Sequence, residues 1–225
     1  MERVITAVES VRGGRKRKVY VNDEWCFSLY PAQLRSHNLE EGMVLTEELY
    51  GRICAETLLP QAKKRVLNLL VAKDRSRKEL FEKLAGDGYP QEVADAAVEY
   101  AESYHYVDDL RFALTYLCSH AEEKSRFQLV AKLKEKGIGR EVIDEAFEVF
   151  REERIAQMGE AFEEAELTAL RRQIARKTKA PAALSQKEIQ KLTASLCAKG
   201  FRGADIRDVL KDLVSTDIPE MDMEL

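Results

Sequence analysis

Apolar and polar residues follow a strand-like spacing in the first part of the chain. Three short stretches rich in β-branched and aromatic residues predict strands. They cover residues 3–9, 18–21 and 25–30. Gly13-Gly14 and residues 22–24 separate them as turns. Thr46, followed by two acidic residues, is typical of the capped start of a helix. We therefore predict a small β-rich module with short helices over residues 1–58.

From about residue 60 onward, apolar residues recur at the 3.6-residue spacing of helices, interrupted by turns that contain glycine. One helical segment occurs three times. Each copy has a serine, a Glu or Gln three residues later, a leucine, and a glycine followed by a hydrophobic residue. The copies contain Ser76, Glu79, Leu84, Gly88 and Tyr89; Ser125, Gln128, Leu133, Gly137 and Ile138; and Ser185, Glu188, Leu196, Gly200 and Phe201. The third copy holds about one extra helical turn.

Each repeated position has a physical role. The serine and the Glu or Gln form a capping box, which satisfies free backbone N–H groups where a helix starts. The glycine supplies the left-handed residue that ends the helix, and the next hydrophobic residue folds back onto the leucine. Three helices with the same start and end indicate an internal repeat.

A further helix is predicted before and after each repeated segment. The preceding helices cover about residues 61–73, 109–121 and, as one long helix, 151–178. Each copy is then a three-helix unit, and such units stack into arrays. We predict a mainly α fold in which three tandem three-helix repeats form an elongated, curved array after the β-rich module. The predicted repeats cover residues 60–106, 107–150 and 151–215, followed by an acidic tail over 216–225.

Four short segments in this order and spacing resemble the RecX family, regulators of the bacterial recombinase RecA. They cover residues 74–80, 106–113 (which include Asp108, Asp109 and Phe112), 133–138 and 199–201. The resemblance spans roughly residues 60–213. Two positions depart from the family pattern: Ser125-Arg126 stands where the family usually has Gly, often followed by Pro, and His105 where Gly is common. The N-terminal module is less characteristic of the family.

The resemblance implies a fold and a partner. Members of the family are crescent-shaped arrays of three three-helix repeats, which lie in the groove of the RecA–DNA filament. They restrain recombination and coprotease activity by blocking filament growth or promoting disassembly. By resemblance we expect a RecA filament on DNA as the partner, with roles in recombination, DNA repair and the SOS response.

The candidate chemistry argues against an enzyme. Asp108-Asp109 is the one acidic pair that suggests catalysis or a metal, but adjacent helical residues point about 100° apart. The favoured interpretation is helix capping, which can include a structural pairing with Arg111 or another basic residue. His37, His105 and His120 form neither a metal set nor a triad, and no phosphate-binding loop motif occurs. We expect no catalytic residue, no cofactor and no metal.

Charge and composition limit the remaining function classes. The 225 residues have a net charge of -4, which argues against a general cationic coat for nucleic acid. No apolar run of 18 residues and no signal-peptide pattern occur, and the four cysteines are scattered. We expect a cytoplasmic protein with reduced thiols, no membrane contact and a monomeric state.

Basic residues recur at equivalent places in the repeats, so the middle helices are expected to give one side a positive potential. We predict that the partner contacts this basic face and a basic hairpin. These candidates are Arg12, Arg15, Lys16, Arg17, Lys18, Lys73, Arg75, Arg77, Lys78, Lys124, Arg126, Lys132 and Lys136. The alternatives are an ordinary solvated surface on the helices and, on the hairpin, a solubilising turn with edge-strand protection.

Three functions remain open on the residues alone. The first is docking on a RecA filament, with weak direct DNA binding possible. The second is sequence-specific DNA binding by helix-turn-helix-like units, which the acidic third helix of the first repeat disfavours. The third is a helical scaffold for another protein. The family resemblance favours the first.

Overall fold

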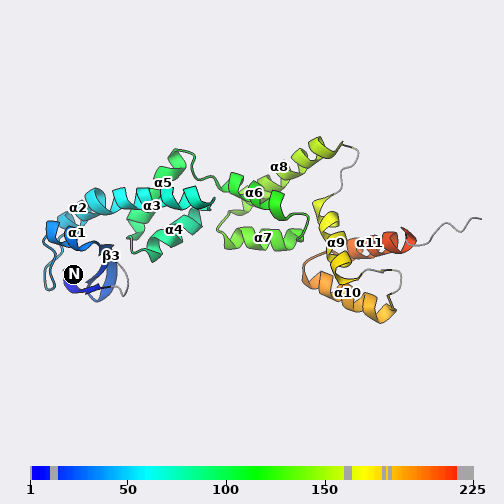
Figure 1. The fold of residues 1–225 in the computed structure, drawn as a ribbon, viewed down its shortest axis with the longest axis horizontal. Coiled ribbons are helices and arrows are strands. Elements are labelled where there is room, and N and C mark those ends of the chain that lie inside the picture. The colour runs from blue at the N-terminus through cyan, green and yellow to red at the C-terminus, as the bar shows by residue number, and fades with distance from the viewer. Residues whose placement is uncertain (1, 11–14, 160–163, 179–180, 182–183, 217–225) are drawn as a thin grey trace, which may run out of the picture. The chain divides into compact units, whose positions relative to one another are not determined.

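A computed structural model describes residues 2–10, 15–159, 164–178, 181 and 184–216. Arg12 and the tail from residue 217 therefore lie outside the described residues. The chain divides into two compact units, with the boundary between Asp109 and Leu110. Helices dominate both units, and the described strands lie in one sheet near the N-terminus (Figure 1). The predicted mainly α fold with a small N-terminal β module is confirmed.

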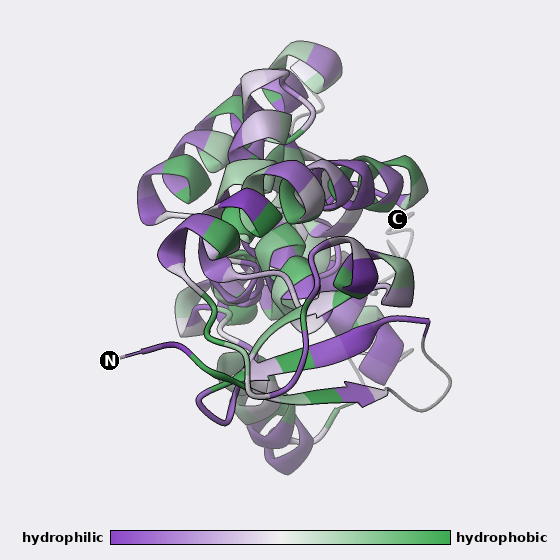
Figure 2. Ribbon diagram, turned by 90° about the vertical axis from the view of Figure 1, so that its left-hand side faces the viewer, coloured by the Kyte–Doolittle hydropathy of each residue, from purple (hydrophilic) through white to green (hydrophobic). Residues whose placement is uncertain are grey.

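The sheet is a three-stranded antiparallel meander. Its strands are β1 (Ile5–Ser10), β2 (Arg17–Val21) and β3 (Glu24–Leu29), in the order β1-β2-β3. Val19 of the central strand pairs with Val8 and Phe27. Figure 2 shows both hydrophobic and hydrophilic residues along the strands. Asn22 and Asp23 connect β2 to β3 with φ angles of 50° and 68°. Positive φ at both residues is typical of the tight turns that match the twist of a hairpin.

Short helices lead from the sheet into the first three-helix unit. They are α1 (Pro31–Ser36), α2 (Glu47–Arg52) and the π-helical turn η1 (Ile53–Leu58). The predicted cap at Thr46 is confirmed, because its hydroxyl accepts a hydrogen bond from the N–H of Leu49 at 3.2 Å. The buried residues of the sheet, including Phe27, form one hydrophobic core with those of the following helices. The β module is therefore part of the first unit.

Among the residues that the structure describes, nine helices follow in three sets. The first set is α3 (Leu59–Ala72), α4 (Arg77–Gly86) and α5 (Gln91–Ser103). The second is α6 (Asp109–His120), α7 (Arg126–Glu135) and α8 (Arg140–Met158). The third is α9 (Ala165–Lys177), α10 (Gln186–Ala198) and α11 (Gly203–Thr216). Within the second unit, each set has its own cluster of buried apolar residues.

The repeated motif forms the predicted helix ends. Capping boxes are present at Ser76, Ser125 and Ser185. Gly88, Gly137 and Gly200 have φ angles of 83°, 85° and 88°, and the N–H of the residue after each glycine donates to the carbonyl of the predicted leucine. These bonds are Tyr89 to Leu84 at 3.1 Å, Ile138 to Leu133 at 3.0 Å and Phe201 to Leu196 at 3.2 Å. This is the Schellman geometry that the sequence predicts.

The predicted single helix over residues 151–178 is wrong. Helix α8 runs on past Phe150 to Met158, and Gly159 follows it with a φ angle of 54°. The next helix, α9, begins at Ala165. The acid-rich half and the basic half of the segment suggested one helix matched to its macrodipole. Glycine at position 159 ends α8 instead, since it adopts positive φ without steric cost.

The C-terminal end of each of two middle helices packs closely on an earlier element of its own unit. A Cβ atom on Gly200 would lie 2.5 Å from Cβ of Phe127, so the end of α10 lies against the start of α7. In the first unit, the carbonyl of Gly88 accepts a hydrogen bond from the N–H of Ser28 at 3.1 Å. The end of α4 thus packs on strand β3, in the same way that the end of α10 packs on α7.

Candidate functional site

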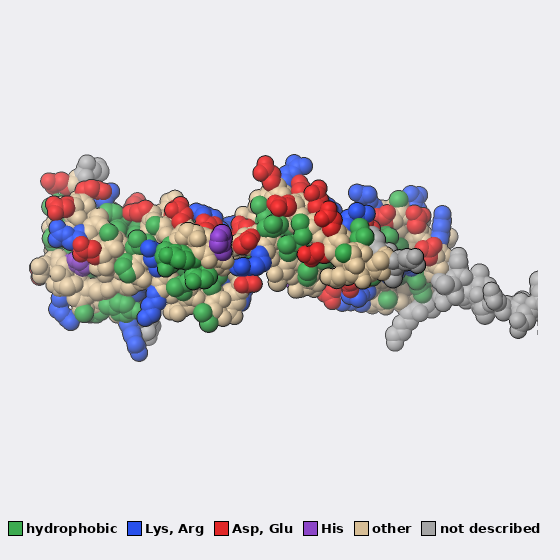
Figure 3. Space-filling model, turned by 90° about the horizontal axis from the view of Figure 1, so that it is seen from above, with side chains coloured by type: hydrophobic (Ala, Val, Ile, Leu, Met, Phe, Trp, Pro, Cys, Tyr) green, Lys and Arg blue, Asp and Glu red, His purple; other side chains and the backbone are tan. Residues whose placement is uncertain are grey.

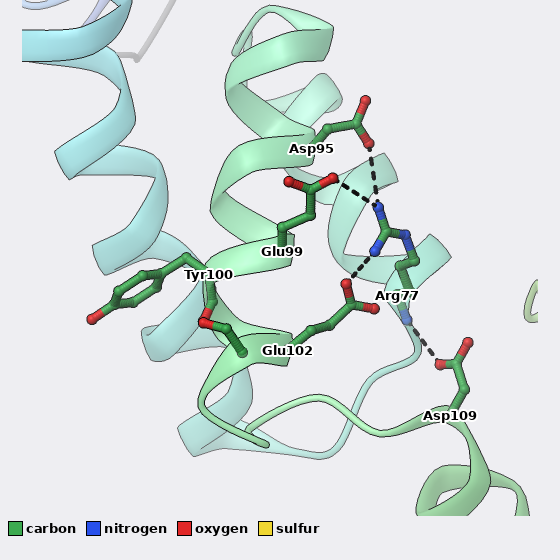
Figure 4. Close-up of polar contacts among 7 residues, drawn as sticks. Arg77, Asp95, Glu99, Tyr100, Glu102 and Asp109 are labelled. Carbon is green, nitrogen blue, oxygen red and sulfur yellow. Dashed lines mark hydrogen bonds and ion pairs between the residues drawn. The ribbon is translucent and has the colours of Figure 1, made fainter.

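Arg77, predicted to contact a partner, is the centre of an intramolecular cluster in the first unit (Figure 4). Its backbone N–H donates to Oδ1 of Asp109 at 3.1 Å. Its guanidinium donates to the carboxylate of Glu102 and lies 3.9 Å from the carboxylates of Asp95 and Glu99. Helix α5 therefore supplies three acids to one arginine at the start of α4. Arg77 holds two helices together, and much of its charge is neutralised before any partner approaches.

Burial affects the acids of this cluster. It raises the pKa of Asp109, against the opposing effects of the Arg77 N–H and the Arg77 charge. Burial also raises the pKa of Glu102, which Arg77 partly offsets. An ionised carboxylate is costly where water is excluded. Because Asp109 accepts from α4, it caps a helix from outside that helix, which the sequence interpretation of Asp108-Asp109 as a local cap did not include.

Arg126 has an equivalent place in the second unit. Its backbone N–H donates to Oε1 of Glu166 at 3.1 Å. Its guanidinium lies 3.7 Å from the carboxylate of Asp144 and 4.0 Å from the ring centroid of Phe147. Arg77 and Arg126 are thus the first residues of α4 and α7, and each is bonded to an acid near the start of a later helix. We interpret both as structural joints of the repeat.

The other predicted cations of the middle helices differ in how far they are engaged. Lys73 and Lys78 are exposed, and Arg75 is half-buried. Lys124 donates to the hydroxyl of Tyr116 at 2.8 Å, and Lys132 pairs with Glu135 at 2.7 Å. Lys136 is half-buried at the C-terminal end of α7. On the face drawn in Figure 3, acidic and basic side chains are interspersed within both units.

The hairpin holds the densest group of described cations. Arg15 is exposed, and the guanidinium of Arg17 donates to the hydroxyl of Ser10. The ammonium group of Lys16 lies 4.5 Å from the ring centroid of Tyr89, and that of Lys18 lies 4.0 Å from the ring of Trp25. Edge-strand protection does not account for these residues, because β2 is the central strand and pairs on both sides. The sequence reasoning missed Trp25 and Tyr30, although aromatic residues near a basic run were a visible signal.

The remaining motif residues are structural. Ser76 and Ser125 are fully buried at their helix starts, and Leu84 is fully buried in the first core. Phe112 packs on the second core, and Phe201 belongs to the third. Asp108 is exposed.

In the described part of the chain, no three His, Cys, Asp or Glu residues gather closely enough to hold a metal ion. No described helix is both long and apolar enough to span a membrane. The four cysteines are free thiols, and burial raises the pKa of Cys26 to about 11. Cys26 is therefore a poor nucleophile at neutral pH.

Comparison with known families matches two of the three-helix sets. A family model described as "RecX, first three-helix domain" matches residues 62–100, and one described as "RecX, second three-helix domain" matches residues 108–146. These ranges coincide with most of α3–α5 and with α6, α7 and the start of α8.

Similar proteins extend the likeness over nearly the whole chain. A protein of Clostridium acetobutylicum called "Regulatory protein RecX" is 26% identical over 215 residues, covering 95% of this chain and 98% of its own. A protein of the same name from Caldanaerobacter subterraneus is 28% identical, covering 92% and 98%. A solved structure, "Crystal structure of regulatory protein RecX", has a TM-score of 0.58 at 20% identity and covers 93% of this chain and 99% of its own. A second, of RecX from Lactobacillus salivarius, has a TM-score of 0.55 at 17% identity.

Proposed function

Because the chain belongs to the RecX family of regulatory proteins, we propose that it regulates a RecA recombinase by binding the RecA–DNA filament. The observation that carries this proposal is the end-to-end likeness to proteins called regulatory protein RecX. The likeness includes the N-terminal β module as well as the three-helix sets. In this proposal the chain lies in the filament groove and inhibits the filament or promotes its disassembly. It acts by binding rather than by catalysis, as a monomer in the cytoplasm.

Repetition supports a filament as the partner. A filament presents the same surface at regular intervals, and tandem units offer similar surfaces in series. Linked weak contacts then add up to a strong one, because each later contact forms intramolecularly. The sequence predicts repeats over residues 60–106, 107–150 and 151–215. Because residues 151–158 belong to α8, we propose a third repeat that begins after residue 158.

Sequence-specific DNA reading has less support. A recognition helix presents Arg, Asn or Gln to base edges. The third helix of the first set, α5, instead presents Asp95, Glu99 and Glu102 to Arg77. Phosphates would be repelled by such a face. We therefore favour contact with protein over base reading.

Steady-state ATP hydrolysis by the cognate RecA on single-stranded DNA, titrated with the full chain, tests the proposal. We expect inhibition at amounts well below one chain per RecA subunit, which end capping or disassembly would produce. Undiminished hydrolysis at excess chain and low salt would contradict filament regulation and favour the general scaffold.

Charge reversal at exposed cations around the first middle helix tests whether the basic face contacts the filament. Lys73 and Lys83 are exposed at the end of α3 and in the last turn of α4. We expect Lys73→Glu/Lys83→Glu to weaken inhibition severalfold with helicity unchanged. The control, Arg35→Glu/Lys64→Glu, reverses two exposed charges elsewhere in the first unit. If both pairs had equal effects, the basic face would be ordinary solvated surface.

A further inference from the structure

An open pocket lies where the β hairpin meets the end of α4 in the first unit. Its volume is about 290 Å³. The lining includes three cations and two aromatic rings, namely Arg15, Lys16, Lys18, Trp25 and Tyr30. Asp87 also lines it, but its carboxylate pairs with the guanidinium of Arg65 at 2.7 Å. A pocket of this size accommodates a group no larger than about one small ligand.

The cations of this pocket are held in place by aromatic rings. Lys16 Nζ lies 4.5 Å and 5.5 Å from the ring centroids of Tyr89 and Tyr30, and it is 3.3 Å from the Tyr89 hydroxyl. Lys18 Nζ lies 4.0 Å from the Trp25 ring. Among the described residues, neither ammonium group forms an ion pair with a carboxylate. Burial lowers the pKa of Lys16, which the charge of Asp87 partly offsets. A partly desolvated ammonium whose neighbouring carboxylate already pairs with Arg65 gains from an incoming anion.

Aromatic surface remains accessible beside these cations. Trp25 is 38% exposed and Tyr30 is 41% exposed. The indole N–H of Trp25 is 3.3 Å from the Phe27 carbonyl and from the Ser28 hydroxyl, which orients the ring. Gly88 lies close to the ring, since a Cβ there would be 2.5 Å from Cζ2 of Trp25. The ring is therefore a fixed platform rather than a mobile side chain.

We propose that this hairpin pocket binds single-stranded DNA, with a nucleobase stacked on Trp25 and the adjoining phosphates against Arg15, Lys16 and Lys18. Cations beside exposed aromatic rings are the combination that single-stranded nucleic acids require. A duplex keeps its bases stacked inside and offers only phosphates to such a site. An acidic protein segment would use the cations but not the rings. The proposal concerns binding by this chain alone and does not require that it regulates RecA.

The fluorescence of Trp25 gives a direct test, because it is the single tryptophan of the chain. The full chain is titrated at low salt, without RecA, with an oligo(dT) strand of about 15 nucleotides. We expect strong quenching by the single strand, and weak quenching by a duplex of equal length or by poly-glutamate. Unchanged emission at saturating oligo(dT) would overturn the proposal, and equal quenching by poly-glutamate would reassign the pocket to an acidic protein.

Variants separate this pocket from general charge attraction. The anisotropy of a labelled oligo(dT) strand reports binding when Trp25 is replaced. We expect Trp25→Ala, and Lys16→Gln/Lys18→Gln, each to weaken binding about tenfold. Lys64→Gln removes one exposed charge from the same unit and should leave the affinity unchanged. Should Trp25→Ala unfold, Tyr30→Ala removes the second exposed ring and should weaken binding severalfold. Full affinity in the Lys16→Gln/Lys18→Gln variant would overturn the proposal.

Because RecA is absent from these titrations, their outcome is independent of the ATP hydrolysis experiment. Loss of filament inhibition with retained Trp25 quenching would leave the pocket assigned to single-stranded DNA. Retained filament inhibition without Trp25 quenching would support filament regulation and contradict the assignment of this pocket to single-stranded DNA.

Discussion

Gly88 combines two roles in one residue, because it ends α4 with a φ angle of 83° and also lets Trp25 and Ser28 approach its Cα. Gly42 has the same φ angle, but a Cβ there would meet nothing within 4 Å. Gly86, at the end of α4, also faces open space and is helical. Substitutions at these three glycines therefore distinguish the cost of left-handed backbone strain from the cost of a steric overlap.

We expect three different effects of alanine on the free energy of unfolding. Gly42→Ala should cost about 1–2 kcal/mol through left-handed strain. Gly88→Ala should cost about 1–3 kcal/mol more, because the added methyl overlaps Trp25. Gly86→Ala should stabilise by up to about 1 kcal/mol. Urea unfolding followed by Trp25 emission, which reports on the first unit, measures all three. Equal costs at Gly42 and Gly88 would mean that Trp25 moves freely and is no fixed platform.

Single residues differ in how far the sequence predicts their role. The serines and glycines of the repeat act on neighbours within five positions, so their local pattern is sufficient to predict capping boxes and Schellman turns. His105 has a φ angle of 57°, the left-handed conformation that Gly adopts without strain, and the family resemblance leads us to expect Gly there. Tyr30 and Trp25 meet Lys16 and Lys18 only through sheet register and packing on α4. That contact depends on tertiary structure, and alternation along one strand does not encode it.

At the scale of helices, an acid of a later helix bonds to the first residue of a middle helix. Asp109 accepts from Arg77, and Glu166 accepts from Arg126. The middle helix keeps its own serine cap, so two acceptors serve one helix start. The positive end of the helix dipole favours such an acceptor. The joint fixes the start of α4 against the segment that leads into α6.

We expect Asp109→Asn and Asp109→Ala to differ. The asparagine oxygen can still accept from Arg77, and burial no longer opposes a charge. The wild-type pKa is raised in the folded state, so ionisation of Asp109 lowers stability as the pH rises through that pKa. Asp109→Asn should therefore equal or exceed the wild type by a few tenths of a kcal/mol at neutral pH, and this difference should shrink in acid. Asp109→Ala should cost about 1 kcal/mol. Unfolding at neutral and acidic pH measures both, and a large loss in Asp109→Asn would show that the charge itself is required.

Helix boundaries show where the element-scale prediction fails. Periodicity and caps place α4, α7 and α10, because start and end signals are both local. Between residues 151 and 178 the charges follow the dipole rule for one helix, yet Gly159 separates α8 from α9. One glycine was therefore more informative than the charge pattern. The acceptor roles of Asp109 and Glu166 were not predictable either, since each bond joins residues more than thirty positions apart.

The charge of the whole molecule argues for few phosphate contacts. The net charge is -4, and Arg77 and Arg126 are engaged with acids of their own units. The hairpin pocket contributes three cations to a bound strand. Single strands lose affinity with a slope of about 0.7 per neutralised phosphate in log K against log salt concentration.

The salt dependence of oligo(dT) binding should therefore be shallow. Three contacts predict a slope of about -2, or roughly a 20-fold loss between 50 and 200 mM salt, against about 10³–10⁵ for a protein that makes 6–10 phosphate contacts. A chain that binds filament mainly through protein should remain on RecA–DNA filaments at salt that removes it from bare DNA. The anisotropy of labelled oligo(dT) measures binding to bare DNA, and cosedimentation measures binding to RecA–DNA filaments. Lys16→Gln/Lys18→Gln should flatten the salt dependence of DNA binding. A slope of -6 or steeper on bare DNA would mean that the middle helices also contact phosphates, and the basic face would then be a DNA surface.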